Sequence, residues 1–596
     1  MTYAAPVREL RFILEDVLSL ESLTDTGAFE DLSSDLTAAI LEEGGKFCAG
    51  VLAPLNHSAD QFGTKFSDGE VTTAPGFKDA YAQFVQGGWQ GLSIAEANGG
   101  MGLPNALGVA FQEMLQSANM AFGLGPMLTM GALEVLSHIG TEKQKFLYLP
   151  RLVSGEWSAS MNLTEPQAGS DVGALRTTAK PAGDGSWLID GQKIFITWGE
   201  HDCAPNIIHL VLARTPDAPA GTKGLSLFLV PKFLLDEDGE PGPRNDVRAI
   251  GVEHKLGIHA SPTCVMEYGG NGGAKGWLIG NEGQGMAMMF IMMNSARLNV
   301  GAQGVGIAER AYQQALSYAR ERTQGRAVNT PDYPAAIIHH PDVRRMLMTM
   351  KAKIAAARSI CLACAMASDR AAHTKEEEAA KRAKAREELL TPLAKTYGSE
   401  VGVEVSSLAL QVHGGMGYIE ETGAAQHYRD ARITPIYEGT NGIQAIDLVG
   451  RKLNMMGGQP MSDLIADMRQ AVADCARSDR DDLPVIGARL EAALNALEET
   501  TQWLRDPERD KADVLAAATP YQNLVCETVG GYFLALGALA AGRLLDVGQE
   551  EHFAKDRIAL ARYFGETVLS AIPGKTGDIY AGAALLFAIS EASLGA

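Results

Sequence analysis

Residues 186–198 read SWLIDGQKIFITW. This stretch decides the fold because the spacing of apolar residues there changes from the pattern of a helix to that of a strand. β-Branched and aromatic residues are frequent in it, as is typical of a strand. Three further runs of the same kind are NIIHLVLAR at 206–214, GLSLFLVP at 224–231 and TCVMEYGG at 263–270. Asp184-Gly185 precedes the first run and Asp190-Gly191 lies within it, and Asp-Gly is a strong signal for a tight turn. The pattern predicts a β domain over 159–280.

Helical patterns lie on both sides of this β domain. Residues 33–55 and 105–140 carry apolar side chains at three- and four-residue spacing, as a helix with one buried face requires. The spacing returns after 281, where Thr391-Pro392 has the character of an N-cap and first helical residue, so we expect a helix to begin there. Gly457-Gly458-Gln459-Pro460 reads as a linker. We therefore expect an α+β multidomain protein with a helical domain at 1–158, the β domain at 159–280, a helical domain at 281–456 and an extra helical domain at 461–596.

The length, net charge and cysteine content of the chain limit the classes of protein to which it can belong. A chain of 596 residues is too long for one hydrophobic core. Its formal charge of −21 argues against a nucleic-acid partner, whose phosphates require clustered Lys and Arg. Seven cysteines, an odd number in a long chain, favour a reducing cytoplasm over a disulfide framework. The N-terminus has no signal-peptide core, so we expect a cytoplasmic protein without membrane insertion.

Cys361 and Cys364 form a C-x-x-C pair inside a helical run. A zinc or redox site would need a second pair or a different setting. Two small residues on a packed helix face are the favoured interpretation, and no metal site is predicted.

Three stretches carry residues suited to a ligand. MNLTEPQAGSDVGALRT at 161–177 offers backbone and hydroxyl donors for a phosphate or a flat ring, although a plain loop explains its composition equally well. GQKIFIT at 191–197 ends in an aromatic and a hydroxyl, and a buried strand is its alternative. QVHGGMGY at 411–418 has glycines that let a cofactor approach the backbone, and a helix C-cap followed by a turn is slightly favoured there.

PIYEGTNG at 435–442 sets one carboxylate between an apolar run and a glycine. Glu438 in this stretch is either a surface residue at the start of a helix or a base in a dry pocket. A dry pocket would make the carboxylate a stronger proton acceptor, because lost hydration disfavours its charged form.

Taken in order, these stretches resemble the acyl-CoA dehydrogenase family. The resemblance also takes in GGMG at 99–102, GTEKQKFLYLPRLVSGEW at 140–157, YARERTQG at 318–325 and YRDARITPIYEGTNGIQ at 428–444. It covers roughly 85–455 and implies that family's N-terminal helical domain, middle β-barrel or sandwich domain and C-terminal four-helix bundle, followed here by an extra C-terminal helical domain.

The resemblance implies FAD between the β domain and the C-terminal bundle, with an acyl-CoA against its ring. Thr197 would bond the ring edge, while Arg322 and Gln324 would reach the flavin of a neighbouring subunit, so a homodimer or homotetramer is implied. The implied FAD contacts are Met161, Leu163, Thr164, Gly169, Ser170, Phe195, Ile196, Thr197, Arg322, Gln324, Gln411, Val412, Gly414, Gly415, Thr440 and Gly442.

Glu438 matches the family's catalytic base, which removes the α-proton of the thioester while the β-hydrogen leaves as hydride. The N–H of the base and a flavin hydroxyl would stabilise the thioester oxygen. The implied substrate contacts are Ser170, Asn294, Arg297, Glu438 and Gly439. A salt-bridged helix arginine is the alternative for Arg297.

Several positions depart from the common pattern. Phe195 stands where tryptophan is usual, with Trp198 three residues on, and Asn294 stands where an acidic residue is common. Gly325 lacks the usual preceding phenylalanine, Gly442 replaces a frequent glutamine, and the C-terminal tail is long. These features resemble the long bacterial branch, which includes the 3-methylthiopropionyl-CoA (3-methylmercaptopropionyl-CoA) dehydrogenases of dimethylsulfoniopropionate breakdown.

The resemblance therefore implies α,β-dehydrogenation of a short acyl-CoA, with 3-(methylthio)propanoyl-CoA as the favoured substrate. An electron-transfer flavoprotein would accept the electrons. The alternatives are a fatty acyl-CoA dehydrogenase of β-oxidation, an acyl-CoA oxidase that uses oxygen, and a non-catalytic flavin-bearing protein like the DNA-associated relatives. The acidic charge and the retained Glu438 speak against the last of these.

Overall fold

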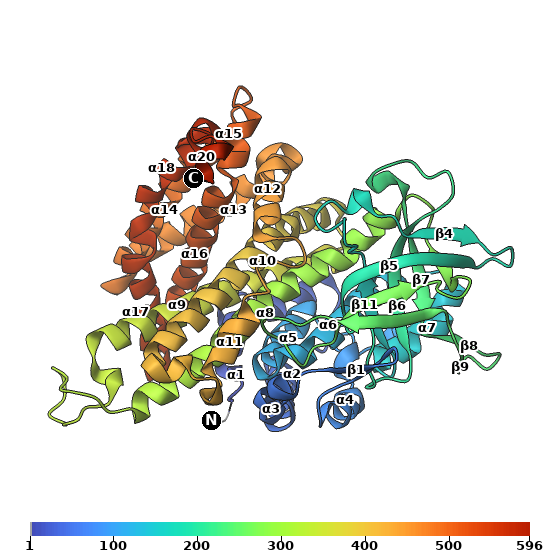
Figure 1. The fold of residues 1–596 in the computed structure, drawn as a ribbon. Coiled ribbons are helices and arrows are strands. Elements are labelled where there is room, and N and C mark those ends of the chain that lie inside the picture. Colours follow the sequence, from blue (N-terminus) through green and yellow to red (C-terminus); the bar gives the residue numbers. More distant parts are fainter. Residues whose placement is uncertain (1–2, 596) are drawn as a thin grey trace. The chain divides into compact units, whose positions relative to one another are not determined.

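The computed structural model describes residues 3–595, which form two compact units. One unit contains 3–5 with 44–296, and the other contains 6–43 with 297–595. Apart from a short hairpin at 65–72, the strands lie in one stretch of the chain between helical stretches (Figure 1), so the predicted α+β class is confirmed. The finer division into four domains stays a prediction.

The unit of 44–296 begins with helices. They are α3 (Asn56–Phe62), α4 (Phe77–Gln86), α5 (Asn105–Ala118), α6 (Met120–Ile139) and α7 (Glu142–Ser154), with a hairpin of β1 (Lys65–Ser67) and β2 (Glu70–Thr72) after α3. Asn119 separates α5 from α6 and caps α6, because its side chain accepts a hydrogen bond from the N–H of Phe122 at 3.1 Å. The single apolar pattern of 105–140 therefore folds as two helices.

An eight-stranded sheet follows these helices (Figure 1). Its strands are β3 (Ser158–Asn162), β4 (Thr178–Pro181), β5 (Trp187–Thr197), β6 (Ile207–Arg214), β7 (Leu225–Pro231), β10 (Val247–Val252), β11 (Thr263–Tyr268) and β12 (Ala274–Ile279), and β8 (Phe233–Leu235) pairs separately with β9 (Pro241–Arg244). The order is β10-β11-β5-β12-β7-β6-β3, with β4 against β5 and β6. Alternate residues face opposite cores: Leu210 packs in the core that includes α6 and α7, and Val211 packs in the other.

Asp190-Gly191 does not form the predicted turn, because β5 runs straight through it. A β-carbon at Gly191 would lie 2.9 Å from the Cα of Thr177, so the glycine is required by the close approach of a neighbouring backbone. Asp184-Gly185 does lie at the turn between β4 and β5, as predicted.

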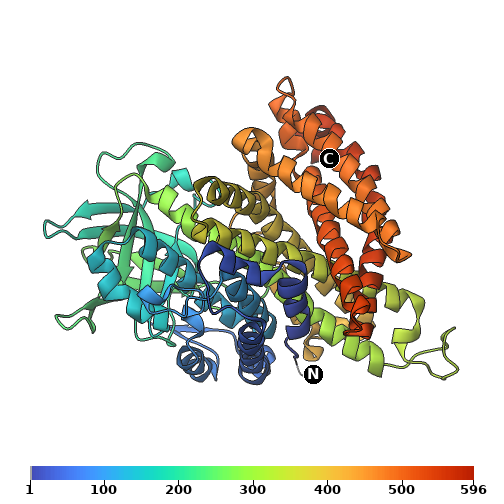
Figure 2. The same ribbon diagram turned by 180° about the vertical axis from the view of Figure 1, so that it is seen from behind.

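The second unit is helical. Its helices are α1 (Val7–Arg11), α2 (Ser34–Phe47), α8 (Gly285–Glu321), α9 (Pro341–His373), α10 (Glu377–His413), α11 (Ala424–Ala431), α12 (Asn441–Gly450), α13 (Gln459–Ala476), α14 (Asp482–Arg505), α15 (Lys511–Ala516), α16 (Ala518–Asp546), α17 (Glu551–Thr567), α18 (Thr576–Tyr580), α19 (Gly582–Leu586) and α20 (Glu591–Leu594), with α2 and α8 each extending into the residues of the other unit. The C-terminal helices α16 and α17 lie beside α9 in both views (Figures 1 and 2).

Two predicted breaks in this unit are wrong. Helix α10 continues through Thr391-Pro392, where packing against α16 holds it: Gln522 donates to the carbonyl of Pro392 at 3.0 Å and to Thr396 at 2.8 Å. The stretch at 457–460 is a tight turn rather than a linker, since α13 begins at Gln459 and Arg505 donates to the carbonyl of Gly457 at 2.6 Å.

Helices α6 and α16 are long and apolar enough to cross a membrane, but their apolar windows are 89% and 78% buried inside the protein. This burial is typical of core helices. The C-x-x-C prediction is also confirmed, because Cys361 and Cys364 are buried on α9 against α10.

Helices α8 and α10 pack backbone to backbone through glycines. A β-carbon at Gly304 would overlap the carbonyl oxygen of Gly398, and one at Gly398 would overlap the carbonyl oxygen of Gly301. A β-carbon at Gly402 would lie 2.9 Å from the carbonyl oxygen of Gly304. No side chain fits in this contact, so glycine sets the distance between the two helices.

This contact predicts the effect of one added methyl group. Gly304→Ala should destabilise the fold by about 2 kcal/mol, because overpacking forces the helices apart. Gly537→Ala in α16 is the matched control, since its β-carbon would meet its nearest atom at an ordinary 3.6 Å and alanine is the better helix former by about 1 kcal/mol. Urea unfolding of both variants measures the difference, and equal stabilities would contradict the packing account.

Candidate active site

Glu438 lies in the turn between α11 and α12, in a strained backbone conformation. Its φ is +56°, in the left-handed region that residues with a β-carbon rarely adopt, and Gly439 follows with φ +81°. Thr440 then caps α12 by accepting a hydrogen bond from the N–H of Ile443 at 3.2 Å. Strain of this kind is stored preferentially at functional sites.

The Glu438 carboxylate is poorly hydrated and unpaired. Its residue is half-buried, and none of the hydrogen bonds in the described part of the chain ends on its carboxylate oxygens. Loss of hydration raises the pKa of Glu438 to about 7, and the positive charges of Arg297 and Lys395 oppose this rise. At neutral pH the group is therefore poised between its acid and base forms, as a general base requires.

The backbone N–H of Glu438 also has no acceptor within residues 3–595. The next bonded amide along the chain is that of Asn441, which donates to the carbonyl of Pro435 at 3.0 Å. A free N–H beside a free carboxylate gives the turn one donor and one proton acceptor for a ligand.

Residues outside the predicted contacts hold this turn in place. Lys395 on α10 donates to the Oδ1 of Asn441 at 2.7 Å, and the Nδ2 of Asn441 donates to Glu400 at 2.6 Å. Ser399 donates to the same Oδ1 at 3.2 Å. Their only sequence signal is helical spacing, which puts Lys395 and Ser399 on one face of α10.

Helix α8 supports the turn from the other side. Tyr437 donates a short hydrogen bond to the side chain of Gln303. Arg297 is 6% exposed, and a β-carbon at Gly439 would lie 3.6 Å from its Nη2 and 2.8 Å from the Nε2 of Gln444. Gly439 is therefore required both by its φ and by this crowding.

Arg297 is a buried cation near the base. Burial lowers the pKa of its guanidinium, while Asp447 and Glu438 favour its charged form. The charges of Glu438 and of Asp447 on α12 thus both act on Arg297, and its role as a substrate contact stays a prediction. Gly442, in the first turn of α12, is exposed.

The predicted flavin loop at 161–177 is organised by a buried ion pair. Lys193 on β5 donates to the carboxylate of Glu165 and to the carbonyl of Leu163, both at 2.9 Å. Glu165 also accepts from the N–H groups of Arg176 and Thr177. Burial would raise the pKa of Glu165, but these partners hold it at about 2. The ion pair closes the loop on itself and ties it to the sheet.

The outer surface of this loop carries the predicted contacts. Met161, Leu163 and Thr164 are half-buried, and Gly169 and Ser170 are exposed. The carbonyl of Thr164 accepts from the N–H of Ile194 at 2.9 Å, which joins the loop to β5.

Phe195, not Trp198, presents an aromatic ring to solvent at the end of β5. Phe195 is 57% exposed, whereas Trp198 is fully buried and donates its indole N–H to the carbonyl of Ala121 at 3.2 Å. Both residues have positive φ, +59° and +51°. Ile196 is buried in the sheet core, and Thr197 is half-buried. Asn294 is half-buried on α8 in this same unit.

The remaining predicted FAD contacts lie on exposed segments of the helical unit. Arg322 and Gln324 are exposed at the end of α8, where the N–H of Gln324 donates to the carbonyl of Ala335 at 2.8 Å. Helix α10 ends at His413, as the C-cap interpretation predicted. Of the predicted contacts there, Val412 is buried, whereas Gln411, Gly414 and Gly415 are exposed, and a β-carbon at either glycine would meet no atom within 4 Å.

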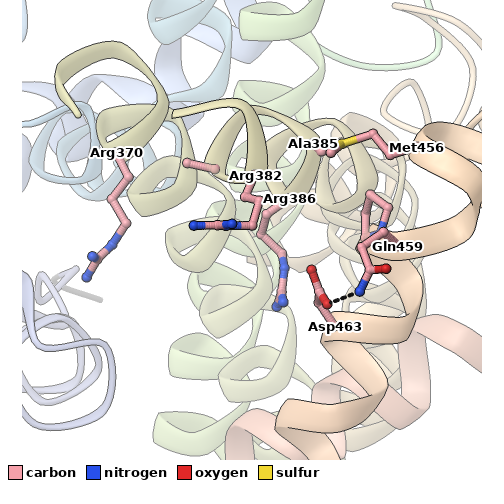
Figure 3. A pocket seen from close by; sticks show the side chains of 9 residues that line it. Arg370, Arg382, Ala385, Arg386, Met456, Gln459 and Asp463 are labelled. Carbon is pink, nitrogen blue, oxygen red and sulfur yellow. Dashed lines mark hydrogen bonds between the residues drawn. The ribbon is translucent and has the colours of Figure 1, made fainter. Parts of the chain in front are cut away.

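A cavity of about 310 Å³ opens elsewhere in the helical unit (Figure 3). Three arginines of α9 and α10 line it, and Arg386 is paired with Asp467 at 2.8 Å. Its lining residues are Arg370, Arg382, Ala383, Ala385, Arg386, Met456, Gln459, Pro460 and Asp463. None of the predicted flavin or thioester contacts is among them.

Comparisons with known proteins cover nearly the whole chain. Models of the acyl-CoA dehydrogenase N-terminal, middle and C-terminal domains match 35–156, 160–269 and 282–453, and a model described as acetyl-CoA dehydrogenase C-terminal like matches 464–590. A 3-methylmercaptopropionyl-CoA dehydrogenase of Ruegeria pomeroyi is 47% identical over 96% of both chains. A butyryl-CoA dehydrogenase of Syntrophomonas wolfei is 35% identical over 97% of this chain and 96% of its own.

The fold is that of solved members of the same family. A crystal structure of an acyl-CoA dehydrogenase from Bacillus anthracis complexed with FAD has a TM-score of 0.73 at 23% identity, over 93% of this chain and 89% of its own. The predicted order of domains, with helices, a middle β domain, a helical bundle and an extra helical domain, is confirmed.

The raised pKa of Glu438 predicts a pH dependence of stability. The folded state binds this proton more tightly than the unfolded chain does, so the residue's stabilising contribution is complete below the ordinary pKa of 4.5 and is lost as the pH rises through about 7. Glu438→Gln should therefore be more stable than wild type at about pH 9, and this difference in stability should disappear toward about pH 4.

Thermal unfolding over this pH range measures the gap, and Glu376→Gln serves as a control of opposite sign. The N–H groups of Glu378 and Ala379 lower the pKa of Glu376, so that variant should lose stability relative to wild type at high pH. A gap between Glu438→Gln and wild type that does not change with pH would contradict the dry-pocket interpretation.

Proposed function

The chain belongs to the acyl-CoA dehydrogenase family, and on this premise we propose that it oxidises 3-(methylthio)propanoyl-CoA to 3-(methylthio)acryloyl-CoA in dimethylsulfoniopropionate breakdown. The 47% identity to the Ruegeria pomeroyi dehydrogenase over 96% of both chains supports this choice. The observation that carries the reaction type is the unpaired carboxylate of Glu438, whose pKa is raised to about 7.

Glu438 is the base of this reaction. Its carboxylate takes the α-proton of the thioester, the Cα–H electron pair forms the new Cα=Cβ bond, and the β-hydrogen leaves as hydride. Desolvation makes Glu438 a stronger base than an exposed glutamate, and a bound acyl chain would exclude more water.

The N–H of Glu438 is a donor for the thioester oxygen, which gains negative charge as the proton leaves. This N–H has no acceptor within residues 3–595, and the positive φ of Glu438 fixes the direction in which it points. One such preorganised donor lowers the activation barrier by about 3 kcal/mol.

FAD is the cofactor in this proposal, and residues of the β-sheet unit fit it. Met161 offers apolar surface, Thr164 and Ser170 offer hydroxyls, and Phe195 offers an exposed ring. A β-carbon at Gly169 would meet no atom within 4 Å, so that backbone is open to a phosphate or a ring. When bound, FAD supplies the two-electron acceptor for the hydride.

An electron-transfer flavoprotein is the proposed acceptor, and a homodimer or homotetramer is the proposed assembly. Exposed apolar side chains near the predicted inter-subunit contacts support the assembly: Val328 and Tyr418 are each 90% exposed, and Tyr333 is 68% exposed. The cytoplasm is the proposed location, which fits seven free cysteines that are buried or half-buried.

Glu438→Gln tests the base. Glutamine keeps the shape of the side chain but accepts no proton, so we expect flavin reduction by the acyl-CoA to slow by at least about 10²-fold. Stopped-flow bleaching of the flavin-loaded full chain measures the rate, with flavin content as the control. Near-normal bleaching would rule out Glu438 as the base.

A panel of acyl-CoAs tests the substrate. The methylthio compound should have a higher kcat/KM than butyryl-CoA with the flavoprotein acceptor present. Equal or better turnover of butyryl-CoA would favour the straight-chain activity of the Syntrophomonas wolfei relative. Peroxide formation without any protein acceptor would identify an oxidase instead.

A further inference from the structure

Lys395 is a buried cation to which the proposed reaction gives no role. Its side chain lies on α10 and is fully buried. Lysine is rarely buried to this extent, because burial removes the hydration of its charge. Its burial beside Glu438 therefore requires an explanation.

The hydrogen bonds of Lys395 lead to the turn that carries the base. Its Nζ donates at 2.7 Å to Asn441, the first residue of α12 and the third after Glu438. The Nδ2 of Asn441 donates to Ser399 at 3.0 Å and to Glu400 at 2.6 Å. Lys395 thus ties the start of α12 to α10 immediately after the strained residue.

The charges around Lys395 act on the same turn. Glu438 and Glu400 favour the charged form of Lys395, and Arg297 on α8 opposes it. Burial is the largest influence and lowers the pKa of Lys395 to about 7. Asp447 favours the charged form of Arg297 in turn, and Arg451 opposes it. Glu438 and Lys395 are therefore coupled, and each favours the ionised form of the other.

We propose that Lys395 is a positioning residue for the base: through Asn441 it holds the turn of Glu438, and through its charge it eases ionisation of the Glu438 carboxyl. The inference rests on the proposed function, in which Glu438 is the base. Lys395 touches neither substrate nor cofactor in this account and acts through Asn441 and through its electric field.

The sign of the effect follows from the charge. A cation lowers the pKa of a nearby carboxyl, so its removal raises that pKa. The rate of flavin reduction rises with pH as Glu438 ionises, and this rise is the acid limb of the pH profile. The acid limb should then move to higher pH by about one unit, since a nearby charge shifts a pKa by about 1 to 3 units. A purely structural role would lower the rate equally at every pH.

Three variants of the flavin-loaded full chain separate charge from hydrogen bonding. Lys395→Gln keeps an N–H donor for Asn441 without the charge, Lys395→Met removes both, and Lys395→Arg keeps the charge. We expect the acid limb to move up in the first two and to stay in place in the third, with a higher plateau rate for Gln than for Met. Lys353→Met on α9 removes a lysine paired with Glu404 instead, and its limb should not move.

Single-turnover flavin reduction gives the pH profiles, so slow variants remain measurable. Acid limbs of Lys395→Gln and Lys395→Met that coincide with wild type would overturn the proposal, as would an equal shift in Lys395→Arg. If Lys395→Met does not fold, Lys395→Gln decides alone. Glu438→Gln measured in parallel distinguishes the proposed function from the proposed role of Lys395. Full activity of Glu438→Gln would refute Glu438 as the base. An inactive Glu438→Gln together with unmoved acid limbs in the Lys395 variants would refute only the role of Lys395.

Discussion

The close contact between α8 and α10 is the constraint on which the base site depends. Gly301 and Gly304 on one helix and Gly398 and Gly402 on the other leave no room for side chains. Because the two backbones meet there, residues next to these glycines or about one turn from them come close to the same loop. Arg297 and Gln303 reach it from α8, and Lys395 and Ser399 reach it from α10. A wider separation would leave the turn of Glu438 without its supports.

Burial of charge has opposite results in the two units. Glu165 and Lys193 are both buried, but the Glu165 carboxylate accepts five hydrogen bonds and its pKa falls to about 2. That pair stays ionised and is structural. Glu438 receives no such hydrogen bonds from any residue of 3–595, so desolvation prevails over the attraction of Arg297 and Lys395 and its pKa rises to about 7. Hydrogen bonding, more than burial, separates the structural carboxylate from the reactive one.

The sequence alone predicted the alternation of helices and strands, because hydrophobic period is a local property. It failed where distant residues decide. The turn expected at Asp190-Gly191 is a continuous strand because Thr177 lies against the glycine, and the helix start expected at Thr391-Pro392 is helix interior because α16 packs there. Glu438 could be singled out from its motif. Lys395 could not, since its role exists only once α10 and α12 meet.

The central claim is that a dehydrated carboxylate at position 438 takes the α-proton of a thioester. The most direct measurement is the deuterium isotope effect on flavin reduction by an α,α-dideuterated acyl-CoA, followed across pH. The account predicts a primary isotope effect and a rate that rises through one ionisation near the raised pKa of about 7. An absent isotope effect, together with a rate that does not change across that pH, would contradict it.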